Sequence, residues 1–100
     1  MVVGMLKVTM IIPENASLKG KRKVVKSLLG RIRSRFNVAA AEVAGNDLWQ
    51  RAELGLAVVG NDRRFVNSVL DKLLDYMERE TEAEVVDAKM DIQNVFGSDG

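Results

Sequence analysis

The residues of this 100-residue chain with the clearest chemical potential are the cations of one predicted helix. Residues 18–36 include no Asp or Glu. On a helical projection, five cations share an arc of about 100° beside the apolar stripe: Lys19, Arg22, Lys23, Lys26 and Arg33. Such a row can replace the counterions of phosphates, and free N–H groups at the helix start favour anions. We predict that a polyanion binds here, with nucleic-acid contacts from Lys19, Lys21, Arg22, Lys23, Lys26 and Arg33.

Two other interpretations of this helix remain open. Its cations could pair with acidic protein, or they could simply face water. Like charges three and four residues apart repel one another on a helix. Because no acid within the helix relieves that repulsion, we rank polyanion binding first, acidic protein second and solvation alone third.

Trp49 and Arg51 follow the turn residues Gly45-Asn46-Asp47 and are predicted accessories to the same function. Arg51 would add a nucleic-acid contact. Trp49 could stack on a base, anchor a protein partner or close one end of the core. We favour packing or a subunit contact for Trp49.

The composition excludes several classes of chemistry. The chain has no His and no Cys, so it lacks the commonest general base, thiolate ligands and a cysteine nucleophile. Asp71 and Asp75 are one helical turn apart, but no phosphate loop or third ligand accompanies them. We predict no catalytic residue, metal site or cofactor, and therefore no enzyme.

Charge is unevenly distributed along the chain. Residues 1–51 have ten basic and three acidic side chains, a net charge of +7, whereas residues 52–100 have five and eleven, a net charge of −6. This asymmetry indicates either a polyanion-binding surface or two surfaces that neutralise each other. The acidic second half is typical of a solubilising surface, and it could also dock against the basic helix of a second copy.

Changes in hydrophobic period predict six elements. Alternation over residues 5–12 predicts a strand that ends in a turn over residues 13–16. Ser17 is a credible N-cap for a helix over residues 18–36. Strands over residues 38–43 and 52–59 follow. Asn61 or Asp62 begins a helix that reaches about Glu80, and a last strand covers residues 84–92, with Val86, Ala88, Met90 and Ile92 on its apolar face.

This order predicts the α+β, ferredoxin-like βαββαβ sandwich. Two helices would cover one face of a four-stranded antiparallel sheet of order 4-1-3-2. Residues 1–96 would form one domain, and residues 97–100 a flexible C-terminal tail. The other sheet face has no aromatic platform for RNA, and no thiolate exists for an iron–sulfur cluster. No leader or membrane-spanning segment is visible, so we expect a cytoplasmic protein without membrane partners.

Two short segments resemble a known family. Ser17-Leu18-Lys19-Gly20-Lys21-Arg22 and Asp47-Leu48-Trp49-Gln50-Arg51-Ala52 are similar to the YlxP-like family of small bacterial proteins, and the resemblance runs from about Val3 to Ile92. It implies a ferredoxin-like domain of unknown function. Family members are often encoded near ribosome-binding factor A and translation genes, which implies a connection to RNA or the ribosome.

The sequence therefore predicts a non-catalytic protein that binds structured RNA or the ribosome through its basic first helix. The second hypothesis is a homodimeric protein-interaction module without direct nucleic-acid binding. That module would use the Trp49 turn, an exposed strand edge, or docking of the basic helix on an acidic one.

Overall fold

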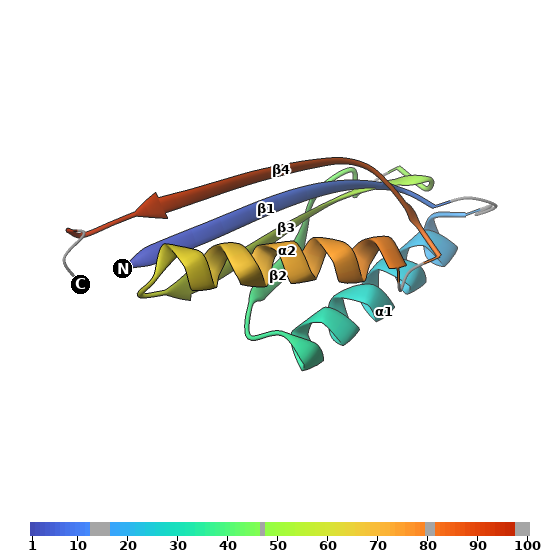
Figure 1. Ribbon diagram of the computed structural model, residues 1–100. Coiled ribbons are helices and arrows are strands. Elements are labelled where there is room, and N and C mark those ends of the chain that lie inside the picture. The colour runs from blue at the N-terminus through green and yellow to red at the C-terminus, as the bar shows by residue number, and fades with distance from the viewer. Residues whose placement is uncertain (13–16, 47, 80–81, 98–100) are drawn as a thin grey trace.

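The computed structural model describes residues 1–12, 17–46, 48–79 and 82–97, and it confirms the predicted order of elements (Figure 1). The predicted turn over residues 13–16, the predicted helix end at Glu80 and the last three residues of the predicted tail lie outside these ranges. The six elements are β1 (Val2–Ile11), α1 (Leu18–Arg35), β2 (Ala39–Ala44), β3 (Arg51–Gly60), α2 (Arg63–Arg79) and β4 (Glu84–Asn94).

The four strands form one antiparallel sheet in the order β2-β3-β1-β4. This is the predicted order counted from the opposite edge, so the ferredoxin-like fold is confirmed. The central strand β1 pairs with β3 and β4 along its whole length. Both helices lie on one side of the sheet (Figure 1). One face of the sheet is therefore covered by the helices, whereas the other face is uncovered.

The core lies between the sheet and the helices. Leu6, Val8 and Met10 alternate with open-face residues along β1, and they are buried against the helices. The apolar stripes of α1 and α2 complete the core with Val25, Leu28, Leu29, Ile32, Val66, Leu70, Leu73 and Met77. Neither helix in the described ranges is long and apolar enough to cross a bilayer.

The predicted apolar face of β4 is partly wrong. The pairing register of β1 and β4 shifts between Thr9 and Met10, so Met10 lies opposite Val85 and not Val86. The extra residue of this bulge changes which side chains face the helices. Val85 and Ile92 pack against the core, whereas Val86 is 50% exposed. Met90 lies opposite the buried Leu6, so it keeps the predicted phase, although it is 40% exposed at the edge of the sheet. The pattern within this strand could not reveal the bulge, whereas the predicted order 4-1-3-2 correctly placed the strand at an edge of the sheet.

Both helix starts have the predicted caps. The Gly20 N–H donates to Ser17 Oγ over 3.0 Å, and the Arg64 N–H donates to Asp62 Oδ1 over 3.3 Å. Each bond satisfies a backbone donor that has no partner within its helix. The Phe36 N–H still donates to the Ile32 carbonyl, but Phe36 itself is extended. Thus α1 ends one residue earlier than predicted.

Two glycines provide a test of this packing. Gly4→Ala is expected to lower the free energy of unfolding by about 1–3 kcal/mol, because the new Cβ would lie 2.4 Å from Val66 Cγ1. Gly30→Ala is expected to raise it by about 0.5–1 kcal/mol, because alanine favours a helix and no atom beyond the adjacent residues and the nearby helix backbone lies within 4 Å of the new Cβ. Denaturant titrations followed by circular dichroism measure both changes. A stabilised Gly4→Ala variant would contradict the described approach of α2 to β1.

Candidate functional site

Four cations form a stripe along α1, which we call the α1 basic face: Lys19, Arg22, Lys23 and Lys26. Their spacing of three, four and seven residues places them within about 100° of arc on a regular helix. The stripe extends over about 10 Å of the helix axis. All four side chains are exposed. The helix therefore presents a compact group of positive charges to solvent.

Ion pairs among the described residues do not neutralise the α1 basic face. None of its four side chains makes a hydrogen bond or an ion pair within the described part of the chain. On α2, Asp75 pairs with Arg79 at 3.0 Å, and Asp71 accepts a hydrogen bond from Asn67 at 3.1 Å. These carboxylates of α2 bind partners on their own helix. The first-ranked interpretation of the basic helix thus keeps its physical basis.

One carboxylate does lie near the stripe. Glu82 lines a small hollow of about 160 Å³ together with Lys23 and Arg31. Its charge makes this side of α1 less positive than the side formed by Arg22 and Lys26. A phosphate group would therefore be attracted most strongly to the half of the stripe that is remote from Glu82.

Lys21 is not part of this surface, and its place in the predicted site is corrected here. The Lys21 side chain is fully buried. Its ammonium group forms an ion pair with the Glu42 carboxylate and donates to the Gly45 carbonyl over 2.8 Å. A buried ammonium group needs such partners, because removal from water is otherwise costly. Lys21 therefore connects the first turn of α1 to the end of β2.

The helical projection contains the signal for this inward position. Lys21 precedes Val25 by four residues and Leu28 by seven, so it belongs to the buried stripe and not to the basic one. On β2, Glu42 lies two residues after the buried Ala40, so both residues are on the helix side of the sheet. A lysine and a glutamate at two core-facing positions of adjacent elements indicate a buried ion pair.

Arg33 lies on the same side of α1 as the basic face, but it is attached to the protein. Its guanidinium donates to the Ala40 carbonyl at the start of β2. The side chain remains exposed, and a guanidinium has further N–H donors for a ligand. Arg33 thus extends the basic face toward the C-terminal end of the helix, in a fixed position.

The structure does not bring Arg51 to the α1 basic face. Arg51 starts β3 and alternates with the buried Ala52, which places it on the sheet face opposite the helices. Its guanidinium lies 3.8 Å from the Glu53 carboxylate. Trp49 lies between β2 and β3 and is 45% exposed. Arg51 therefore does not share a surface with the four cations.

No group of three or more metal-ligating side chains occurs in the described ranges. Asp71 and Asp75, the two carboxylates one helical turn apart, interact with Asn67 and Arg79 of the same helix. The prediction that the protein is not an enzyme remains a prediction.

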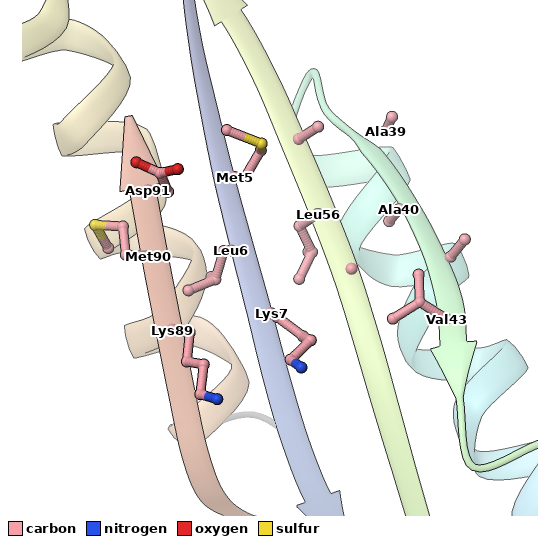
Figure 2. Close-up of a pocket in the computed structure, with 13 residues that line it drawn as sticks. Met5, Leu6, Lys7, Ala39, Ala40, Val43, Leu56, Lys89, Met90 and Asp91 are labelled. Carbon is pink, nitrogen blue, oxygen red and sulfur yellow. The ribbon is translucent and has the colours of Figure 1, made fainter. Parts of the chain in front are cut away.

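A second surface lies on the open face of the sheet (Figure 2). Here the four strands enclose a shallow, mostly apolar hollow of about 490 Å³. Figure 2 shows Met5 and Val43 over the strands, with the helices behind them. We call this surface the open-face hollow, and the side chains on this face are Met5, Lys7, Ala39, Ala41, Val43, Ala57, Lys89 and Asp91, with Gly55 between them.

The fold and these surfaces define a small ferredoxin-like protein with a basic helix on one side and an uncovered sheet on the other. Residues 3–90 match the family described as "Protein of unknown function (DUF503)". The chain is also 34% identical over 82 residues to "Uncharacterized protein YlxP" of Bacillus subtilis (strain 168), across 82% of this chain and 89% of that protein. The chain therefore belongs to this YlxP-like family, as its sequence motifs indicated.

The role of Lys21 can be tested by comparison with its exposed neighbour Lys23. Lys21→Met is expected to lower the free energy of unfolding by about 3 kcal/mol, because it leaves the Glu42 carboxylate without its ammonium partner. Lys23→Met removes the same charge from an exposed position, and no measurable loss is expected. Urea titrations of both variants measure the difference. Equal losses would show that Lys21 is not held inside the fold.

Proposed function

We propose that this protein binds structured RNA through the α1 basic face and catalyses no reaction. One observation supports this proposal above all others: Lys19, Arg22, Lys23 and Lys26 are exposed on one side of α1 and lack side-chain partners in the described structure. Four like charges so close together repel each other, and a phosphate backbone would relieve that repulsion.

The contacts of this surface would be mainly to phosphates. Lysine ammonium groups act as point charges, whereas the planar fork of Arg22 can bind two phosphate oxygens at once. Such contacts fix the position of a protein on a nucleic acid but do not identify its bases. The proposed binding therefore depends on the shape of a folded RNA and on salt.

The open sheet face is less suited to RNA. It has no aromatic side chain in its hollow, and it carries the carboxylates of Asp87 and Asp91 on β4. Base stacking is the usual way in which a ferredoxin-like sheet binds single-stranded RNA. Its absence from the hollow favours helix α1 as the contact surface.

We propose RNA rather than DNA as the ligand because of the genes that lie near those of the family members. Its members are often encoded beside genes for translation and ribosome maturation, so ribosomal RNA is the proposed target. The chemistry of the α1 basic face would suit either nucleic acid, and the two should therefore be compared in the same assay.

The double variant Arg22→Ala/Lys26→Ala tests the proposal. It removes two neighbouring charges from the half of the stripe that lies away from Glu82. Binding to a folded ribosomal RNA fragment is expected to weaken, and the slope of log affinity against log salt to fall in magnitude by about 1.4–1.8. Filter binding over a salt series measures both quantities, with a DNA duplex as the competing ligand.

The matched control is Arg64→Ala/Lys72→Ala, which removes two exposed charges from α2. This control keeps the same net charge as the test variant. If both double variants lose the same affinity, only total charge matters and the α1 basic face is not the binding site. Wild-type affinity in the Arg22→Ala/Lys26→Ala variant would also contradict the proposal.

A further inference from the structure

We propose that two copies of this chain pack against each other sheet to sheet, through the open-face hollow. This surface lies on the side of the sheet away from α1, so the inference does not depend on RNA binding. The occupant of the hollow is a second copy related by a two-fold axis, and the pattern of charges beside the hollow identifies it.

The first observation is the exposed apolar floor of the hollow. Within the hollow, β2 and β3 present only small side chains and Val43, which is 55% exposed, on this face. Gly55 permits this arrangement, because a Cβ at that position would lie 2.8 Å from Val43 Cγ1. Met5 extends the floor onto β1 (Figure 2). Covering such a surface removes apolar area from water.

The second observation is a pair of like charges without a counterion. Lys7 and Lys89 lie directly opposite each other on β1 and β4. Like charges at such positions destabilise a sheet. Neither lysine has a side-chain partner in the described part of the chain, and Figure 2 shows both amines beside the hollow. The two amines therefore lack an anion in their own row, and the nearest carboxylates of β4, those of Asp87 and Asp91, lie one row away on either side.

In the pairing register, the carboxylate of Asp91 lies in the row next to Lys7 and Lys89. One row across the strands contains Ala41, Gly55, Lys7 and Lys89, and the adjacent row contains Ala39, Ala57, Met5 and Asp91. Adjacent rows on one face are two residues apart, about 7 Å. Among the described residues, Asp91 accepts a hydrogen bond from Gln93 alone, two residues further along β4, so its carboxylate can accept more.

A two-fold axis in the plane between two stacked sheets brings these rows together. The axis runs across the strands, midway between the two rows, so each row of one copy faces the other row of its partner. Lys89 then faces the partner's Asp91, and Asp91 faces the partner's Lys89. Met5 meets the stem of the partner's Lys7, and the small residues of β2 and β3 meet one another. The face is thus complementary to itself.

The size of the face suits a dimer. Strands of 6, 10, 10 and 11 residues that lie about 4.8 Å apart cover roughly 600 Å². Stable protein interfaces bury about 800 Å² per partner, and transient ones bury less. Aligned sheet packing at about 10 Å would enclose both hollows between the copies. The carboxylates of Asp87 and Asp91 make the same face unfavourable for a polyanion.

Charge reversal at two positions provides the test. Lys89→Asp alone places like charges at both symmetry-related contacts, and so does Asp91→Lys alone. Each single variant is expected to raise the dimer Kd by about 30-fold, since two contacts each change from attraction to repulsion. A 1:1 mixture of the two variants restores opposite charges at both contacts. Sedimentation equilibrium at concentrations up to about 1 mM measures all of these species.

The mixture distinguishes a broken interface from a damaged fold. The proposal predicts that the wild type and the mixture dimerise with similar Kd values, while each variant alone is mostly monomeric. The double variant Lys89→Asp/Asp91→Lys should recover the wild-type Kd. Matched controls on α2, Lys72→Asp and Asp71→Lys, reverse the same charges on an exposed helix and should not change the Kd.

Three results would overturn the proposal. A wild-type chain that stays monomeric at the highest concentration has no such interface. A dimer that tolerates each single reversal as well as it tolerates the controls must use another surface. A mixture that stays monomeric while its parent variants are folded would exclude this two-fold arrangement of the sheets.

Discussion

The buried ion pair of Lys21 and Glu42 determines how helix α1 presents its charges. An ammonium group inside the fold cannot be left alone, so Lys21 must face β2 and the turn at Gly45. Rotation of α1 about its axis would break this contact and expose the apolar stripe at the same time. Because Lys21 points inward, Lys19 and Lys23 at two positions on either side point outward. One buried cation thus fixes the direction of the exposed ones.

The sheet separates two surfaces of opposite character. The helix side holds the core and, beyond it, the positive charges of α1. The other side is flat, mostly small or apolar near β2 and β3, and of mixed charge near β1 and β4. A strongly basic surface attracts anions at long range, whereas a flat apolar surface with alternating charges favours a closely fitting protein. The two surfaces can therefore serve separate purposes without competing for one ligand.

Much of this fold was predictable because its signals are local. Alternation in β1 and β3, the helical stripes and the caps at Ser17 and Asp62 each depend on neighbours in sequence. The site was less predictable, because its residues depend on distant contacts. The helical projection places Lys21 among the buried positions of α1, but its partner Glu42 comes from β2, 21 residues further along the chain, and Arg51 belongs to the other face of the sheet. The phase of β4 depends on a bulge opposite Thr9, which no pattern within β4 itself reveals.

Both helices cover the same face of the sheet, and this arrangement has a consequence for any pair of copies joined through the bare face. The two basic helices would then point away from each other, on the outermost layers of a four-layer particle. The two helices could not contact the same short nucleic-acid segment from both sides. If α1 binds RNA as proposed, such a particle would instead join two separate segments, so its effect would depend on how far apart those segments lie.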